Sequence, residues 1–462
     1  MKNLSLGLLL VLILVGISQQ TLFAQGVLLA NGTLTSSSAG QNKDLSGLDY
    51  KLENDVDADL LGGLGSGLTY VSGDTFLAIP DRGPNAVSYN AAVDETASFI
   101  ARFQTVKMSL VPNGGSGLPF LLSPQLSATT LLFSPSPLVY GSGMGLGLGS
   151  GVPPLNRPSR HYFTGRSDNF DADKNSGDPR DARFDPESIR VSNNGLFVFI
   201  SDEYGPYVYQ FNRFSGQRVR TFQLPASFYV SNLKPIGNDE ISDNLTGRTA
   251  NKGMEGLAIT PDGKTLVGIM QAAFIEDALV GGATGKLLRI VTIDIESGEV
   301  THQFAYKLTT GSGVSEITSL NDHEFLVDER DGKGLGDGSK AAVKQIFKID
   351  LNGAFDVSEL NGTDAVAHAV SKTLVLDVVK VLKANGWADT QIPAKLEGIT
   401  FGPDVAYNGN TLHTLWVAND NDFLQDFSGT NTNPNMYFVF GLTDVELGSP
   451  YVPQNVHSPF DK

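Results

Sequence analysis

One hydrophobic pattern recurs five times along the chain. Each copy opens with an acidic or small residue, continues as a short apolar strand, turns, and returns as a second apolar strand with a polar or acidic end. Repeats of this size indicate an array of similar supersecondary units, and apolar runs separated by turn residues indicate β-hairpins. Four of the five copies begin with glutamate, and their first strands are Ser66–Tyr70, Glu187–Val191, Glu255–Ile259, Glu316–Leu320 and Glu397–Phe401.

Turn residues separate the two strands in most copies, as in Ser72-Gly73-Asp74 and Pro261-Asp262-Gly263. A third and sometimes a fourth apolar strand follow, for example Tyr207–Phe211 and Arg220–Leu224. Four short antiparallel strands per repeat describe a propeller blade. We therefore predict an all-β chain folded as a β-propeller of about six or seven four-stranded blades. Two stacked β-sandwiches are the alternative, but the equal modules favour a ring.

The remaining segments are predicted around this ring. Residues 27–60 are expected to complete the last blade, because propellers usually close by pairing strands from both ends of the chain. The gap between the first two copies holds either an undetected blade within residues 110–165 or a long insertion. A helical pattern near residues 362–383 predicts a short excursion between the fourth and fifth copies.

The first residues have the pattern of an export signal. Lys2 precedes an apolar run, Leu6–Gly16, that is too short to span a bilayer, and Leu22-Phe23-Ala24 offers a small-residue cleavage site. We interpret residues 1–24 as a signal peptide and residues 25–462 as a single propeller domain. No later stretch is long and apolar enough for a membrane span. The expected product is a secreted or periplasmic monomer.

Composition narrows the partners. The chain has no cysteine, so disulfides cannot stabilise it. Its formal net charge of -17 argues against nucleic acid, because a phosphate backbone repels such a surface. A small anionic or ester substrate is the expected partner, and an anion would need a local cationic site or a bound metal.

The leading glutamates are the first candidates for chemistry. If the repeats superpose, the first residues of the innermost strands meet at one end of the central channel. Carboxylates so close together repel one another unless they are protonated or share a cation. Oxygen ligands suit Ca²⁺ or Mg²⁺. We predict a divalent cation, Ca²⁺ in the first instance, with ligands from Glu187, Glu255, Glu316, Glu397, Asp81 and Asp202. The alternative is structural: each glutamate caps backbone N–H groups of the neighbouring blade.

Two arginines follow acids at the ends of second strands. Arg82 and Arg330 are the best candidates for gripping an anionic oxygen, and salt bridges with the adjacent acids are their alternative role. The predicted catalytic set is therefore Glu255, Glu397 and Glu187 with Arg82 and Arg330.

Five motifs carry a resemblance to a known family. They are Asp81-Arg82-Gly83-Pro84-Asn85, Asp185-Pro186-Glu187-Ser188-Ile189, Ser201-Asp202-Glu203-Tyr204-Gly205, Asn251–Ala258 and Lys395–Asp404. In this order they resemble the phytase-like family, also called "esterase-like activity of phytase", from about Leu45 to Phe440. The resemblance implies a β-propeller and the hydrolysis of phosphoesters or esters.

These observations favour an exported propeller hydrolase that acts on phosphoesters or small esters with a cation held by channel carboxylates. Water would be the nucleophile, activated by the metal or by a glutamate. No Gly-x-Ser-x-Gly sequence exists in the chain, which disfavours a serine hydrolase of the α/β type. Two alternatives stay open: a non-catalytic binding or scaffold propeller of the cell envelope, and a lactonase-type propeller with one axial calcium.

Overall fold

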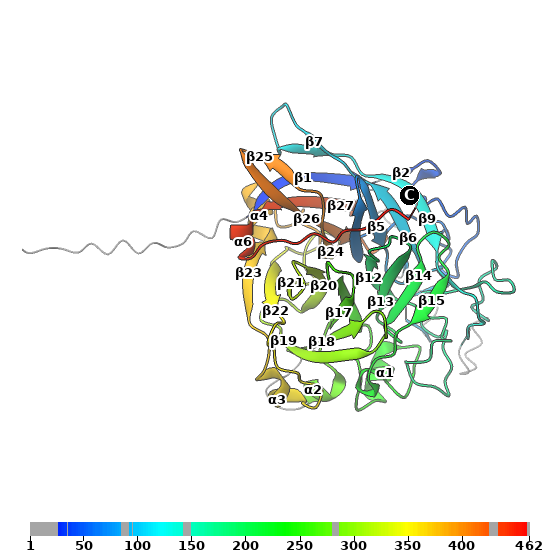
Figure 1. The fold of residues 1–462 in the computed structure, drawn as a ribbon. Helices are drawn as coiled ribbons and strands as arrows, with labels where there is room; N and C mark the ends of the chain where they lie inside the picture. Colours follow the sequence, from blue (N-terminus) through cyan, green and yellow to red (C-terminus); the bar gives the residue numbers. More distant parts are fainter. Residues whose placement is uncertain are drawn as a thin grey trace, which may run out of the picture.

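Five four-stranded antiparallel sheets surround a central channel in the computed structural model of the chain (Figure 1). The structure describes residues 26–34, 36–84, 92–94, 96–141, 149–279, 286–424 and 433–459. The innermost strands follow one another around the channel, and the last lies beside the first. The fold is a five-bladed β-propeller. The predicted signal peptide, residues 1–24, lies outside the described residues.

Each blade runs outward from the channel in the order of the chain, except for the last strand of the fifth blade. From the inside outward, blade one consists of β4 (Gly67–Ser72), β5 (Thr75–Ile79), β6 (Arg102–Lys107) and β9 (Gln125–Leu131), and blade two of β12 (Pro186–Val191), β13 (Phe197–Asp202), β14 (Val208–Asn212) and β15 (Arg218–Thr221). Blade three consists of β16 (Met254–Ile259), β17 (Thr265–Met270), β18 (Leu287–Asp294) and β19 (Val300–Lys307), and blade four of β20 (Gly313–Ser319), β21 (Glu324–Arg330), β22 (Lys344–Asp350) and β23 (Lys372–Asp377). Blade five consists of β24 (Lys395–Phe401), β26 (Asn410–Asp420), β27 (Asn435–Leu442) and β1 (Val27–Leu34).

The ring closes by pairing the two ends of the described chain. Strand β1 lies antiparallel to β27, with Val27 opposite Gly441 and Leu34 opposite Asn435. The prediction that the N-terminal segment completes the last blade is therefore confirmed for residues 27–34. The small hairpin of β2 (Ser36–Ser37) and β3 (Gly40–Gln41) follows and lies near β9.

The predicted count of six or seven blades is wrong. The predicted count came from dividing the chain length by the repeat spacing. That calculation counts long connecting segments as if they were additional blades. The long gap between the first two copies holds an insertion rather than a blade: its strands β6 and β9 complete blade one, and the rest forms short pieces. These are β7 (Leu110–Pro112), β8 (Phe120–Leu122), β10 (Phe133–Ser134) and β11 (His161–Tyr162).

The helical excursion predicted near residues 362–383 is right in part. Two helices occur there, α3 (Gly362–Val366) and α4 (Val378–Ala384), but the segment between them is β23, the outermost strand of blade four. The fifth copy contains an extra hairpin strand, β25 (Val405–Tyr407), paired with β26. The other short helices of the described chain are η1 (Ala226–Phe228), α1 (Gly237–Ser242), α2 (Ile275–Leu279) and α6 (Asp444–Leu447).

The core lies between neighbouring blades. Every residue of β12 and β16 is buried, because both faces of an inner strand pack against adjacent sheets. Between blades one and five, for example, Trp416 packs on Phe76 with ring centroids 4.5 Å apart.

The C-terminal segment crosses the end of the channel at which the inner strands finish, and Figure 1 shows it passing in front of β24. It contacts three blades: Tyr451 stacks on Phe401, Val452 N–H donates to Leu320 O, and His457 N–H donates to Asn193 O. This end of the channel is therefore covered. Within the described part of the chain, no helix has both the length and the apolar character to cross a membrane.

A glycine at the junction of the first and fifth blades tests the closed ring. A Cβ on Gly65 would overlap the backbone of Asn419 at the end of β26. We expect Gly65→Ala to lower the free energy of unfolding by about 1–3 kcal/mol, as overpacking generally does. Urea denaturation measures the loss. Gly114→Ala, where a Cβ meets no neighbouring atom, is the matched control and should change stability by less than about 0.5 kcal/mol. Equal stability of both variants would contradict the close contact of the two blades.

Candidate functional site

A polar cavity of about 260 Å³ opens at the other end of the channel, where the inner strands begin. The inner strands of blades two, three and five contribute Glu187, Glu255 and Glu397, and the ends of second strands contribute Asp81, Glu203 and Asp420. Four cationic side chains line the same cavity: Arg82, Lys252, Arg330 and Lys395. Six carboxylates and four cations thus face a small volume at the start of the channel.

Glu187 differs from the other acids of the cavity because its carboxylate has no hydrogen-bond or ion-pair partner in the described part of the chain. Its side chain lines the cavity and is 8% exposed, and among the described residues it makes no hydrogen bond or ion pair. Burial raises the pKa of Glu187 well above its usual range, and the charges of four neighbouring acids, Glu255, Asp185, Glu203 and Asp81, raise it further. A buried carboxylate surrounded by carboxylates is unstable in its charged form unless a proton or a cation joins it.

Two acids beside Glu187 are only partly satisfied. Glu203 accepts a hydrogen bond from Gly253 N–H at 3.0 Å, and burial raises its pKa. Glu255 Oε1 accepts from Gln271 Nε2 at 2.7 Å, whereas Oε2 of Glu255 is buried and has no hydrogen-bond partner among the residues that the structure describes. Burial raises the pKa of Glu255 well above its usual range, and the Glu203 carboxylate adds to the effect.

Asp185, Glu187 and Glu203 form a group suited to a cation. One carboxylate oxygen from each lies within 4.8 Å of the other two. Ca²⁺ binds oxygens at about 2.3–2.6 Å, so two ligands of one ion can be about 5 Å apart. Arg82 occupies only one side of this group, donating from its backbone N–H and its Nη1 to Asp185 at 3.0 and 2.8 Å. The spacing, the oxygen donors and the unpartnered Glu187 all fit a hard divalent cation.

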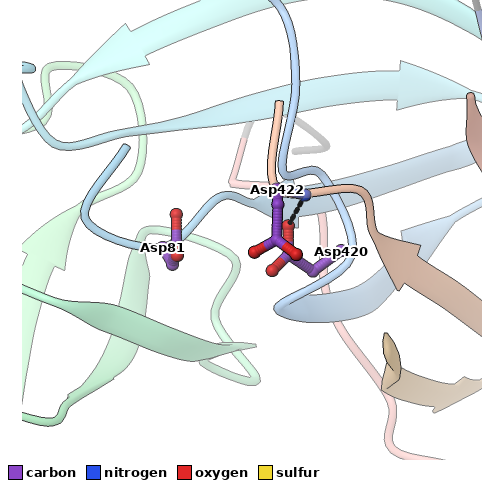
Figure 2. Close-up of side chains that lie close together, drawn as sticks. All are labelled: Asp81, Asp420 and Asp422. Carbon is purple, nitrogen blue, oxygen red and sulfur yellow. Dashed lines mark hydrogen bonds between the residues drawn. The ribbon is translucent and has the colours of Figure 1, made fainter. Parts of the chain in front are cut away.

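A second acidic group, Asp81, Asp420 and Asp422 (Figure 2), has the same oxygen spacing but already contains a cationic side chain, Lys395. Lys395 Nζ donates to Asp420 at 2.8 Å and also to Asp422. Although burial opposes it, this ammonium holds the pKa of Asp420 below its usual value. The side chain of Lys395 therefore takes the place that a metal ion would need.

Arg330 joins the acids of blades three and five. Its Nη2 donates to Glu397 Oε1 and lies 4.0 Å from Glu255 Oε1. Burial raises the pKa of Glu397 to about 7 even though Arg330 opposes the shift. Both candidate arginines thus pair with acids of other blades rather than with the acids that precede them in the chain, and both still line the cavity.

Glu316 does not reach the cavity. Its carboxylate is fully buried deeper in the channel and accepts hydrogen bonds from Ser188 Oγ and from Leu257 N–H. It also pairs with Arg190 at 3.0 Å. Burial raises the pKa of Glu316 to about 7, against the opposing charge of Arg190. Glu316 therefore performs the blade-locking role that the sequence left as the alternative.

Arg190 fills the centre of the channel. Its guanidinium donates to backbone carbonyls of three other inner strands, those of Leu68, Ile317 and Ile399. Blade three is reached through the partner of Arg190, because the Glu316 carboxylate accepts the backbone N–H of that blade's inner strand. One ion pair thus contacts all five inner strands and forms the floor that separates the acidic cavity from the covered end.

The side chain of Asp202 stabilises a turn and does not line the cavity. Its carboxylate accepts N–H groups of Asp185, Tyr204 and Gly205 at 2.9–3.1 Å. Burial nevertheless raises the pKa of Asp202 to about 7. Of the predicted metal ligands, Glu187, Glu255, Glu397 and Asp81 line the cavity, whereas Glu316 and Asp202 do not.

The family named "phytase-like: esterase-like activity of phytase" matches residues 59–423, which include every carboxylate of the cavity. The chain belongs to the phytase-like family. The resemblance found in the sequence motifs is thereby confirmed.

Other similarities are more distant. An uncharacterized secreted protein of Arthroderma benhamiae is 28% identical over 344 residues, which make up 65% of this chain and 65% of that protein. A gluconolactonase structure from Xanthomonas campestris is 10% identical, with a TM-score of 0.30 over 82% of this chain and 87% of that one. Hydrazine synthase of Kuenenia stuttgartiensis is also 10% identical, with a TM-score of 0.31 over 85% and 88%. Neither structural similarity is close enough to bear on the chemistry of the phytase-like cavity.

Five charged residues of the site are absent from the predicted set: Asp185, Glu203, Lys252, Lys395 and Asp420. Asp185 and Lys395 each lie two residues before a leading glutamate, so the period-2 geometry of a strand could have placed them on the same side as Glu187 and Glu397. Lys252 lies in a long connector, where no repeat marks it. Glu203 directly follows the predicted ligand Asp202, and Glu203 rather than Asp202 lines the cavity.

The channel ion pair gives a stability prediction. Arg190→Met leaves Glu316 as an unpaired buried acid, and we expect a loss of about 3–5 kcal/mol in the free energy of unfolding at pH 8. Arg190→Met combined with Glu316→Gln removes that charge and should be more stable than the single variant. Urea denaturation of both proteins checks the order. A double variant less stable than the single one would show that the ion pair is not the source of the loss.

The buried acids also predict a pH dependence. In EDTA, Glu316 and Glu397 have folded-state pKa values of about 7 and Asp328 of about 8, above their ordinary values. The folded protein therefore holds protons that unfolding releases, and stability must fall as pH rises from about 5 to 8. The slope is on the order of 1 kcal/mol per pH unit for each group that titrates. Asp328→Asn should flatten the decline in urea titrations. A stability that rises with pH across this range would contradict the assignment.

Proposed function

We propose that this member of the phytase-like family is an exported hydrolase of phosphoesters or small esters, with a divalent cation held at the mouth of the propeller channel. The observation that carries the proposal is Glu187, a buried and unpartnered carboxylate on the cavity wall, surrounded by other acids. Its two nearest partners in a metal group are Asp185 and Glu203. Export is supported by the signal pattern of residues 1–24 and by a relative that is described as secreted.

Asp185, Glu187 and Glu203 would hold the cation, for which Ca²⁺ is the first candidate. When bound, such an ion polarises a phosphoryl or carbonyl oxygen and lowers the pKa of water. Arg330 and Arg82 present guanidinium groups to the same cavity, where they can orient an anionic oxygen. In the acidic group of Asp81, Asp420 and Asp422, the Lys395 ammonium already pairs with Asp420 and Asp422, which disfavours a second ion there.

Glu255 is the best candidate for the general base. Its Oε2 is buried and accepts no hydrogen bond from the described residues, so in the charged form, which a neighbouring cation would favour, it can take a proton from an attacking water. The water oxygen then bonds to the phosphorus or carbonyl carbon, the ester bond breaks, and the departing alkoxide takes the proton that Glu255 removed from the water. Gln271 holds the other oxygen, Oε1, and thereby fixes the direction of the carboxylate.

Cation binding and turnover test the proposal together. Wild-type protein stripped with EDTA and titrated with Ca²⁺ should bind one ion by calorimetry and gain about 2.7 kcal/mol of stability at a hundredfold excess over Kd. It should hydrolyse p-nitrophenyl phosphate or p-nitrophenyl acetate only in the loaded form. Glu187→Gln should lose both properties.

Asp422→Asn is the matched control, because it alters the acidic group that already contains the Lys395 ammonium. It should keep Ca²⁺ binding. Loss of binding in Asp422→Asn but not in Glu187→Gln would move the cation to the other group. Binding without any turnover of either ester would favour a non-catalytic propeller.

A further inference from the structure

Lys252 is the one cation of the cavity lining that has no carboxylate within 4.0 Å among the described residues. Arg82 pairs with Asp185, Arg330 with Glu397, and Lys395 with Asp420 and Asp422. Lys252 instead donates from Nζ to Gln271 Oε1 at 3.2 Å. It is exposed, so its charge faces the solvent entrance of an otherwise acidic cavity.

The connector that carries Lys252 is held in place by a buried ion pair. It joins β15 to β16 and contains α1, from which Glu240 points inward with 2% of its surface exposed. Glu240 Oε1 lies 2.6 Å from Arg248 Nη2, and Oε2 lies 3.4 Å from Arg183 Nη2. Burial alone would raise the pKa of Glu240, but the two arginines hold it below its usual value. Glu240 is thus a charged anchor inside the connector.

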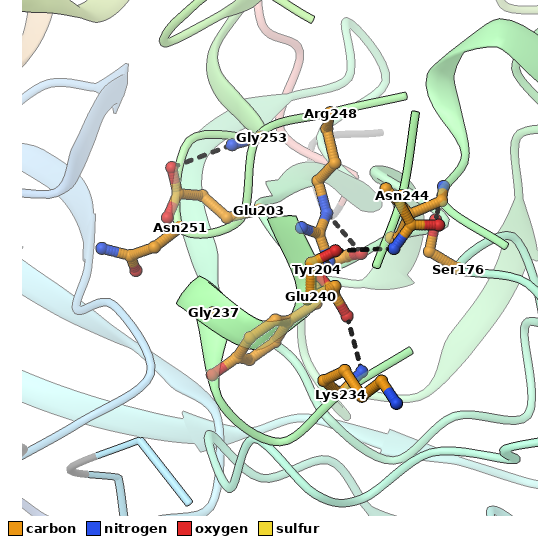
Figure 3. Close-up of polar contacts among 12 residues, drawn as sticks. Ser176, Glu203, Tyr204, Lys234, Gly237, Glu240, Asn244, Arg248, Asn251 and Gly253 are labelled. Atoms are coloured by element: carbon orange, nitrogen blue, oxygen red, sulfur yellow. Dashed lines mark hydrogen bonds and ion pairs between the residues drawn. The ribbon is translucent and has the colours of Figure 1, made fainter. Parts of the chain in front are cut away.

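This anchor continues directly to the cavity (Figure 3). Arg248 Nε donates to Tyr204 O at 3.0 Å, which fixes the connector to the turn after β13. Gly253 N–H then donates to Glu203 at 3.0 Å, and the two backbones approach so closely that any Cβ on Gly253 would overlap Glu203. Between these two fixed points, Asn251 has a positive φ of 55° and its side-chain oxygen accepts from Arg82. Lys252 is therefore presented on a short rigid bridge, although its side chain is solvent-exposed.

We propose that Lys252 selects anionic substrates by binding a phosphate or carboxylate oxygen at the cavity entrance, and that Glu240 is the positioning residue that fixes it there. The inference rests on the proposed hydrolase function of the same cavity. The Lys252 ammonium makes no ion pair within 4.0 Å among the described residues, so it keeps hydrogen-bond donors available to an anion, and the fixed bridge removes part of the backbone entropy cost of binding. The other three cations, Arg82, Arg330 and Lys395, form ion pairs with carboxylates of the protein.

Comparison of a charged with a neutral ester tests the role of Lys252. In Ca²⁺-loaded protein, Lys252→Met should raise the KM for p-nitrophenyl phosphate about tenfold or more, the usual effect of losing a charge-assisted hydrogen bond. It should lower kcat/KM for p-nitrophenyl acetate far less, and Lys252→Arg should restore most of the affinity for the phosphate ester. Lys264→Met is the matched control, since Lys264 is an exposed lysine in the hairpin turn of the same blade. An equal loss on both esters, or the same loss in Lys264→Met, would overturn the proposal.

Glu240→Gln tests the positioning role. It should raise the KM for p-nitrophenyl phosphate more than the KM for p-nitrophenyl acetate, while the number of Ca²⁺ ions bound stays at the wild-type value. A loss of turnover equal for both esters would indicate a merely structural residue.

Calorimetry with inorganic phosphate separates this inference from the proposed function. If the wild type hydrolyses neither ester but binds phosphate, and Lys252→Met binds it at least about tenfold more weakly, the hydrolase proposal fails and the anion site stands. If the wild type binds no phosphate, or binds it only as tightly as Lys252→Met does, the anion site fails whatever the turnover.

Discussion

The ion pair of Arg190 and Glu316 is the interaction on which the ring depends. Arg190 lies on the inner strand of blade two and donates to the carbonyls of blades one, four and five, while Glu316 belongs to blade four and accepts a backbone N–H of blade three. Inner strands diverge from one another at the centre of a propeller and cannot pair their backbones there. A single buried guanidinium and carboxylate satisfy backbone groups there and link the five inner strands to one another.

That central lock also accounts for the chemistry above it. Because Arg190 is committed to Glu316 and to carbonyl oxygens, it offers no charge to the acids at the strand beginnings. Those acids are neutralised by side chains that come from the connectors and strand ends: Arg82, Arg330 and Lys395. Compensation is complete around Asp420 and incomplete around Glu187. The asymmetry is what distinguishes a candidate metal group from a structural one among acids that look alike.

Much of this arrangement could be predicted from repeats. All five hairpins proved to be the inner halves of blades, and three of the four leading glutamates line one cavity, because equivalent positions of a ring converge. The blade count could not be predicted in the same way, since connectors such as the one between β9 and β12 are as long as a blade. Glu316 differs from the other leading glutamates because it pairs with Arg190. Nothing in the sequence distinguishes Arg190 from other polar residues of the inner strands, so this pairing could not be predicted. Lys252 escapes prediction because its position follows from contacts of a non-repeating connector rather than from any period.

The covered end of the channel has a consequence for traffic through the molecule. Tyr451, Val452 and Gln454 lie across one opening, and the Arg190 floor closes the passage behind them. Water, a reactant and both products of a cleavage must then pass through the same entrance, that of the acidic cavity. A product that keeps a negative charge would leave past the lysine that admitted it, so tight capture and rapid exit oppose each other, and the balance between them would set the pace of repeated cycles.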